Sequence, residues 1–409
     1  MASIAKITCH KIINSRGEWT IQTRVALDDG SVGIQTIPDG ASKGKKEAAY
    51  IEVEKAVEMV STVINDALKG ESPFDQGRID RLLVEIDGTP NKKHLGANSI
   101  LSVSLAVSKA AAVSKKLPLY KYLAELFGNA DGFTFPTPIF NVLNGGLHAN
   151  NGLSFQEFMV IPAGRIAYDD ALEMGVTIYH TLEKHLKKAG KDVDVGDEGG
   201  FAPNGFTPKT AMEFLKHSAG ENYKVGEEVF FGMDVAADSF KKIVSYTIDE
   251  EELHLSVDGL LDYYSELLDE YPIIYMEDPF HETDYKGWKK FHDKHHENVL
   301  VVGDDLVVTN PTILEELIPE RLNNAVIVKP NQVGTLTETF EFIKIAKKAS
   351  MMTIISHRSG DTAEDTFIAD LAVATGADFI KSGAPARGER VAKYNRLLEI
   401  FLHEQDVTV

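Results

Sequence analysis

Apolar runs that end on a charged residue recur through the second half of the chain. The runs at 271–276, 299–303 and 324–328 are short and rich in Val and Ile, and stretches with helical periodicity such as 335–348 and 364–375 follow them. Their charged endings recur every 24 to 28 residues. Short buried strands that alternate with helices at this period predict parallel β/α units. We therefore expect a β/α barrel of the TIM type.

The residues that end these strands are chemically active types. A β/α barrel gathers the carboxyl ends of its strands around one mouth, so these side chains would converge there. A single acid at a strand end can simply cap the next helix, but three at successive strand ends favour an active site. The charged residues at or just after the strand ends are Asp234, Glu277, Asp304, Lys329, His357, Arg358 and Lys381.

The first part of the chain has a different pattern, with strands followed by helices. Asp28-Asp29-Gly30 is a hairpin turn signal, which indicates an antiparallel meander. Residues 101–108 alternate like a strand, but they continue into an Ala-rich segment, so we expect a helix to Lys115. Strands are predicted at 4–13, 20–28 and 31–37, and amphipathic helices at 47–68 and 75–86.

These patterns predict two domains, as a length of 409 residues also favours. An α+β domain occupies 1–127, and a linker rich in turn formers covers 131–138. The barrel occupies 138–409. The fold class is therefore α/β, with a C-terminal β/α (TIM-like) barrel preceded by a smaller α+β domain that contains a three-stranded antiparallel meander.

Charge and cysteine content narrow the class of partners. A net charge of −20 argues against nucleic acid or an anionic membrane as the primary ligand. Cys9 is the only cysteine, which excludes a disulfide within the chain and favours a reducing compartment. The first residues have no apolar signal core, and no run approaches the ~18 apolar residues of a membrane span. We expect a cytoplasmic protein, and surface display cannot be predicted from the sequence.

Three motif-like stretches fail on their details. Residues 40–46 resemble a phosphate-binding loop but are one residue short and lack Ser or Thr after the lysine. The stretch from Asp192 resembles a calcium loop, yet its sixth position is Asp197 instead of Gly and its twelfth is Pro203 instead of Glu. Residues 294–297 (Lys-His-His-Glu) are interpreted as a solvated helix end in preference to a metal cluster.

Longer motifs closely resemble one family, the enolases. Asp87-Gly-Thr and Leu95-Gly-Ala-Asn98 match in the first domain, and the resemblance extends over nearly the whole chain. The matching barrel stretches are 141–148 (Asn-Val-Leu-Asn-Gly-Gly-Leu-His), 156–159 (Gln-Glu-Phe-Met), 195–204 (Val-Gly-Asp-Glu-Gly-Gly-Phe-Ala-Pro-Asn), 277–279 (Glu-Asp-Pro), 303–306 (Gly-Asp-Asp-Leu), 356–360 (Ser-His-Arg-Ser-Gly) and 381–387 (Lys-Ser-Gly-Ala-Pro-Ala-Arg).

The resemblance implies a reaction and its residues. An enolase dehydrates 2-phosphoglycerate reversibly to phosphoenolpyruvate in glycolysis, with two Mg²⁺ ions of which the second arrives with substrate. Hard carboxylate oxygens suit Mg²⁺. The implied metal ligands are Asp234, Glu277 and Asp304, with Ser42 for the second ion. The implied catalytic groups are Lys329 as base, Glu198 as acid with Glu157 beside it, and His357. The implied substrate contacts are His148, Gln156, Arg358, Ser359 and Lys381.

Two electrostatic expectations follow from these roles. Lys329 must be neutral to remove a proton, and nearby cations such as Lys381 would lower its pKa. Two acids that share a site raise the pKa of one of them, so one of Glu157 and Glu198 can stay protonated near neutral pH.

The chain departs from the family pattern in its loops. Glu18-Trp19 stands where the family has Asn-Pro, 39–43 reads Asp-Gly-Ala-Ser-Lys, 148–151 reads His-Ala-Asn-Asn, and 360–364 has what looks like one extra residue. These changes concern loop closure, second-metal affinity and subunit contacts. We expect a homodimer or a higher homo-oligomer.

Two other functions stay open at this point. A related acid-sugar dehydratase would share the metal and base chemistry, but it would not need the phosphate contacts expected of Arg358 and Ser359. A binding role on a host surface or in an RNA-processing assembly would need no catalysis. The chain ends in Val409 without a terminal lysine, so we do not expect capture through such a lysine.

Overall fold

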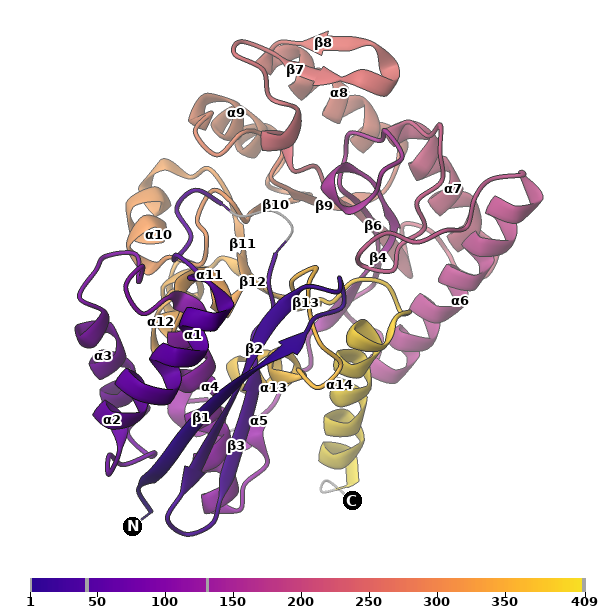
Figure 1. The fold of residues 1–409 in the computed structure, drawn as a ribbon. Helices are drawn as coiled ribbons and strands as arrows, with labels where there is room; N and C mark the ends of the chain where they lie inside the picture. The colour runs from indigo at the N-terminus through magenta and orange to yellow at the C-terminus, as the bar shows by residue number, and fades with distance from the viewer. Residues whose placement is uncertain (1, 41–43, 130–131, 407–409) are drawn as a thin grey trace.

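The computed structural model describes residues 2–40, 44–129 and 132–406. Figure 1 shows a three-stranded sheet flanked by helices in front of a barrel that the rest of the chain forms. The sheet has the order β1-β2-β3 and is antiparallel, as predicted. The elements of this first part are β1 (Ile4–Ile13), β2 (Trp19–Leu27), β3 (Val32–Thr36), α1 (Val53–Met59), a π-helical segment at Val60–Ile64, α2 (Asn65–Leu68), α3 (Gln76–Asp87), α4 (Ala97–Lys115) and α5 (Leu119–Phe127).

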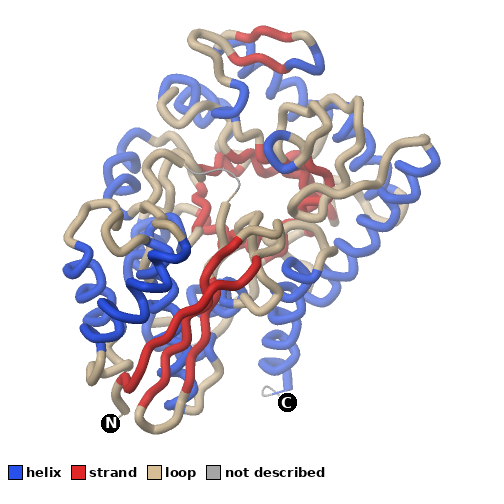
Figure 2. The backbone as a smooth tube through the Cα atoms, viewed as in Figure 1, coloured by secondary structure: helices blue, strands red, loops and turns tan. Residues whose placement is uncertain are grey.

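The barrel is closed, in the order β10-β11-β12-β13-β4-β5-β6-β9. Figure 2 shows its strands as a ring with helices outside. Its strands are β4 (Thr137–Asn144), β5 (Glu157–Pro162), β6 (Val229–Asp234), β9 (Ile273–Glu277), β10 (Leu300–Gly303), β11 (Ala325–Val328), β12 (Met352–Ser356) and β13 (Phe379–Lys381). Its helices are α6 (Tyr168–Lys188), α7 (Pro208–Gly220), α8 (Val257–Glu270), α9 (Tyr285–His295), α10 (Pro311–Leu317), α11 (Pro330–Val333), α12 (Leu336–Lys348), α13 (Phe367–Thr375) and α14 (Gly388–Asp406). A two-stranded hairpin, β7 (Tyr246–Ile248) and β8 (Leu253–Leu255), lies outside the ring.

The predicted β/α barrel is thus confirmed, with one strand reversed. The strands at the predicted endings pair in parallel, but β5 runs antiparallel to both β4 and β6. Only residues 145–156 separate β4 from β5, and they contain no crossover α-helix, which a parallel connection would need. The reversal brings the first residue of β5, Glu157, into register with Asp234, the last residue of β6. The start of β5 therefore lies at the barrel mouth.

The predicted helix at 47–68 begins later than expected, at Val53. The preceding residues bond to neighbouring parts of the fold instead of to one another. The Ala48 amide donates to the Gln332 carbonyl at 2.8 Å, and the Ala49 amide donates to the Asn91 carbonyl at 2.8 Å. Tertiary contacts therefore hold this segment out of the helix. One of its residues, Glu47, pairs with Arg358 of the barrel.

Helix α4 confirms the helical interpretation of the alternating stretch at 101–108. Nearly all of its residues are buried, including four serines. The Ser102 and Ser108 hydroxyls donate to backbone carbonyls three residues earlier, Ser99 and Leu105, so these polar groups are satisfied inside the core. Within the described residues, α4 alone is long and apolar enough to cross a membrane, but 83% of its apolar window is buried in the protein. It is a core helix.

A glycine lets α4 lie close against the sheet. A Cβ atom on Gly33 of β3 would stand 2.0 Å from the Ala106 carbonyl oxygen and 2.4 Å from the Ala110 nitrogen. We expect Gly33→Ala to lower the free energy of unfolding by ~1–3 kcal/mol, because backbone of α4 must move. Urea unfolding followed by circular dichroism measures this. Gly388→Ala is the control, since a Cβ there meets open space. Equal stability of the two variants would contradict this packing.

Candidate active site

The mouth of the barrel collects the described members of the predicted site. Lys329 is largely buried and the others are buried. Ser42 lies outside the described residues, so its role stays a prediction. Asp234, Glu277 and Lys381 end β6, β9 and β13, Asp304 and Lys329 follow β10 and β11, His357, Arg358 and Ser359 follow β12, Gln156 and Glu157 stand at the start of β5, His148 lies between β4 and β5, and Glu198 lies between α6 and α7.

Lys381 is the positive centre of this mouth. Its Nζ atom lies 2.8 Å from Glu277 Oε2. Asp234 Oδ2 and Glu157 Oε2 each lie 3.2 Å from the same nitrogen. Burial alone would lower the pKa of Lys381, but these acids outweigh it and raise the pKa well above its ordinary value. Lys381 is therefore a permanent cation that allows three acids to be buried together.

A second cation holds Asp304. Lys329 Nζ forms a short ion pair with Asp304 Oδ2, and Gln332 Nε2 donates to Asp304 Oδ1 at 2.9 Å. Thr309 completes the network, since its hydroxyl donates to Gln332 Oε1 at 2.7 Å and accepts from the Lys329 amide at 2.9 Å. Both oxygens of the Asp304 carboxylate are thus held in place by defined donors.

The expected lowering of the Lys329 pKa is wrong for this arrangement. Burial does lower the pKa of Lys329, and so does the charge of Lys381, but the ion pair with Asp304 outweighs both and raises it. The residue types near Lys329 could be predicted from the sequence. Which neighbour makes the direct contact could not.

The predicted metal ligands fit a hard divalent cation in chemistry and charge. Asp234, Glu277 and Asp304 offer carboxylate oxygens, the donors that Mg²⁺ prefers. Glu277 Oε1 is buried and has no hydrogen-bond partner among the described residues. Burial and the charge of Asp234 raise the pKa of Glu277 to about 7, which marks an excess of negative charge that a cation would relieve.

The structure does not, however, bring all three predicted ligands into one tight group. Lys381 lies against Asp234 and Glu277, whereas Asp304 is turned toward Lys329 and Gln332. Among the described residues, two other groups of three have ligand atoms within 4.8 Å of one another. They are His148, Glu157 and Glu198, and Asp278, Asp304 and Asp305.

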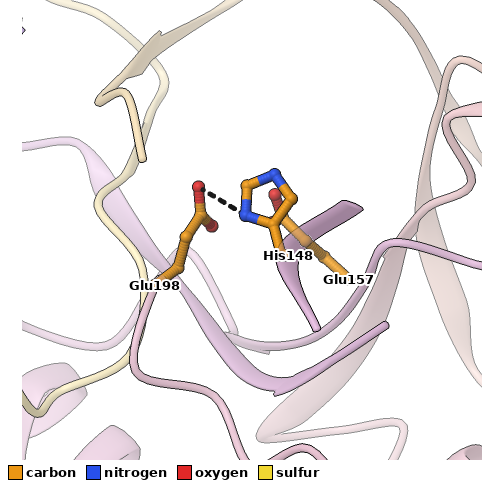
Figure 3. Close-up of side chains that lie close together, drawn as sticks. All are labelled: His148, Glu157 and Glu198. Carbon is orange, nitrogen blue, oxygen red and sulfur yellow. Dashed lines mark ion pairs between the residues drawn. The ribbon is translucent and has the colours of Figure 1, made fainter. Parts of the chain in front are cut away.

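Figure 3 shows the first of these groups, with the His148 ring beside Glu157 and Glu198. His148 Nδ1 lies 3.2 Å from Glu198 Oε1, without the alignment of a hydrogen bond. Asn141 Nδ2 donates to Glu198 Oε2 at 3.0 Å. Burial and the charge of Glu198 raise the pKa of Glu157 well above its ordinary value. Burial opposes ionisation of Glu198 as well, but its interactions with His148, with His357 and with the Arg390 guanidinium outweigh burial and lower its pKa.

The pKa values of the two acids are thus shifted in opposite directions, raised for Glu157 and lowered for Glu198, so Glu157 is the member that holds a proton more readily. The implied acid was Glu198. The difference arises because Glu198 faces His148, His357 and the buried Arg390, whereas Glu157 adjoins the other acids. The ligand atoms of the two carboxyls lie within 4.8 Å of each other, so the titrations of the two acids are coupled.

Arg390, which the sequence did not single out, sets the state of His357. Arg390 Nη1 lies 2.5 Å from His357 Nδ1, and a guanidinium can only donate, so Nδ1 accepts. The imidazole proton is then on Nε2, which lies 3.4 Å from Glu198 Oε2. Burial lowers the pKa of His357 to about 3. His357 is thus a neutral side chain whose Nε2–H lies near Glu198 without the alignment of a hydrogen bond.

The first part of the chain reaches the predicted phosphate contacts. Arg358 Nη1 donates to both oxygens of Glu47, at 3.2 and 3.3 Å. Arg16 Nη1 donates to Ser359 Oγ at 3.1 Å, and its Nη2 donates to Glu18 Oε2 at 2.6 Å. Glu18 is one of the departures from the family pattern. Glu18 is thus connected to Ser359 through the hydrogen bonds of Arg16.

Asp278 holds two strand ends together, a role that the sequence analysis missed. Its carboxylate accepts from the backbone amides of Asp304 and Asp305, at 3.0 and 2.9 Å. Its own backbone has a φ of 42°, a left-handed conformation that is uncommon for a residue with a side chain. Its place after Glu277 in the Glu-Asp-Pro motif was the available signal. Asp278 therefore positions Asp304.

Two family models match this chain and together cover nearly all of it. Residues 4–123 match the one described as the enolase N-terminal domain. Residues 132–407 match the one described as the enolase C-terminal TIM barrel domain.

The state of His357 can be measured directly. We expect its ¹⁵N-labelled imidazole to stay neutral and protonated on Nε2 from pH 8 down to pH 5, because its pKa is lowered to about 3. Nuclear magnetic resonance of histidine-labelled protein reports both properties, and His357→Gln identifies the signal. An unfolded histidine titrates near pH 6.5, so this burial also predicts stability that is present above that pH and is lost as the pH falls toward 3. A His357 midpoint near 6.5, or a proton on Nδ1, would contradict the assignment.

Proposed function

Since the chain belongs to the enolase family, we propose that it catalyses the reversible, Mg²⁺-dependent dehydration of 2-phosphoglycerate to phosphoenolpyruvate. The reaction breaks the C2–H bond and the C3–O bond, forms the C2=C3 double bond, and releases water. It needs a base for the C2 proton and an acid for the departing hydroxyl. The proposal assigns the first role to Lys329 and the second to the pair Glu157 and Glu198.

One observation carries this proposal: the base and the acid pair stand on opposite sides of the mouth. Lys329 follows β11, whereas Glu157 begins β5, and these strands are four places apart in the closed ring of eight. A substrate between them loses its proton on one face and its hydroxyl on the other. That arrangement suits an anti elimination.

The charged groups of the mouth have distinct parts in the proposal. Asp234, Glu277 and Asp304 would hold Mg²⁺, and Ser42 would reach a second ion. When bound, these ions would supply positive charge that stabilises the substrate carboxylate as the C2 proton leaves. Lys329 can accept that proton only in its neutral form. Its ion pair with Asp304 must therefore break before Lys329 acts as the base.

The remaining groups bind and orient the substrate. Arg358 is a buried, permanent cation whose fork suits a phosphate, and Ser359 lies beside it in the chain. Lys381 balances the substrate carboxylate, with Gln156 next to it, since Gln156 Nε2 donates to Asp234 Oδ2 at 3.2 Å. His148 and the neutral His357 flank Glu198, at 3.2 and 3.4 Å from its two carboxylate oxygens.

The proposal extends to the setting of the reaction. The single cysteine supports a cytoplasmic location, and the proposed reaction would belong to glycolysis and gluconeogenesis. A homodimer or a higher homo-oligomer stays a prediction.

The direct test is phosphoenolpyruvate formation from 2-phosphoglycerate, followed by ultraviolet absorbance with Mg²⁺ and after chelation. We expect turnover only with the metal. Asp304→Asn should lower kcat/KM by about a thousandfold, since a metal contribution of several kcal/mol is lost. Asp269→Asn, a change at an exposed acid of α8, is the control. Turnover of a nonphosphorylated acid sugar, with none of 2-phosphoglycerate, would favour the acid-sugar dehydratase instead.

A second experiment separates the base from the acid. Lys329→Ala should abolish exchange of the C2 proton with deuterated solvent, because no other assigned group removes it. Glu198→Gln should keep that exchange and lose phosphoenolpyruvate formation, because the base remains. Both are read by nuclear magnetic resonance of the substrate in deuterium oxide. Normal exchange in Lys329→Ala would show that another group is the base.

A further inference from the structure

A tyrosine lies beneath the proposed metal ligands, inside the barrel. Tyr275 and Glu277 are two residues apart on β9, so both side chains point to the same face of the strand. The Tyr275 ring belongs to the cluster that fills the barrel interior, with Ile139, Met159, Ile161, Val302, Ala325, Ile327 and Ile354. Tyr275 is fully buried and no solvent reaches it. Its hydroxyl needs a partner within the protein.

That partner is Glu277. The Tyr275 hydroxyl donates a short hydrogen bond to Glu277 Oε2, and Lys381 Nζ lies 2.8 Å from the same oxygen. The other oxygen, Oε1, is buried and has no hydrogen-bond partner among the described residues. The two oxygens of this carboxylate are therefore unequal. One is held by two donors, and the other is left to a ligand.

Packing fixes where the tyrosine hydroxyl stands. Gly232 of β6 pairs in register with Tyr275, and a Cβ atom there would lie 3.1 Å from Tyr275 Cβ and 3.2 Å from its ring carbon Cδ1. The absence of a side chain at Gly232 thus makes room for the ring. Apolar neighbours from several strands surround the rest of it. The hydroxyl is presented to Glu277 from a rigid support.

We propose that Tyr275 is a positioning residue that holds Glu277 Oε2, so that Glu277 binds the divalent cation through Oε1 alone. The inference rests on the proposed function, because it assumes that Glu277 is a metal ligand. It goes beyond that function in naming which oxygen binds and what orients it. Partners that orient a metal ligand in this way commonly change metal affinity by about 10- to 100-fold when they are removed.

The test is Tyr275→Phe, which keeps the ring in the barrel interior and removes only the hydroxyl. Mn²⁺ and Mg²⁺ binding are measured without substrate, by electron paramagnetic resonance and by calorimetry. We expect about 10-fold weaker binding of both ions. Tyr168→Phe is the matched control, since that buried hydroxyl donates to the Tyr394 carbonyl at 3.0 Å, away from the acids. It should bind both ions as the unmodified chain does.

Thermal unfolding of the metal-free variants separates a loss of metal-ligand positioning from a loss of fold stability. Tyr275→Phe and Tyr168→Phe should lose similar amounts of thermal stability in a chelator, while only the first loses metal affinity. If Tyr275→Phe does not fold, Tyr275→Met fills the space without a hydroxyl and takes its place.

Three further results would overturn the inference. Metal affinity of Tyr275→Phe within twofold of the unmodified chain overturns the positioning role, and so does failure of both Tyr275 variants to fold. If the unmodified chain itself binds neither ion, the metal site of the proposed function fails, and this inference fails with it.

Discussion

The buried charge balance around Lys381 is the constraint on which the mouth of the barrel depends. Its partners come from three other strands, with Glu157, Asp234 and Glu277 in register across β5, β6 and β9. A slip of one residue in any of these strands would turn its acid away from the mouth. An acid without its cation would then be buried at a large energetic penalty. Folding to the correct register and assembling the site are one event.

Around this balance, the mouth divides into two electrostatic regions. On one side, lysine ion pairs and backbone amides hold the acids at the ends of β9 and β10. On the other, burial lowers the pKa values of His148 and His357 and raises that of Glu157. The same physical factor, removal from water, thus strengthens ion pairing in one region and suppresses ionisation in the other. The closed barrel makes both possible within a small volume.

Local sequence pattern predicted most of the fold and the charged residues that end the strands at the mouth, because strand endings and hairpin turns are local signals. The three strands of the meander, for instance, lie within one or two residues of their predicted bounds. The features that the pattern did not predict depend on contacts between residues distant in sequence. The direction of β5, the late start of α1 and the raised pKa of Lys329 each follow from a partner that no local pattern specifies. The contact of Arg390 with His357 was not predicted for the same reason.

The bond between Glu47 and Arg358 links the small domain to the chemistry of the large one. Arg358 is buried in the barrel, yet a carboxylate that neutralises it comes from residues before the first helix. A barrel separated from that segment would lose this counter-charge, and breaking a buried ion pair by removing one partner commonly costs about 3–5 kcal/mol. The barrel is thus unsuited to transfer by recombination as an independent module. The two domains are constrained to be inherited together.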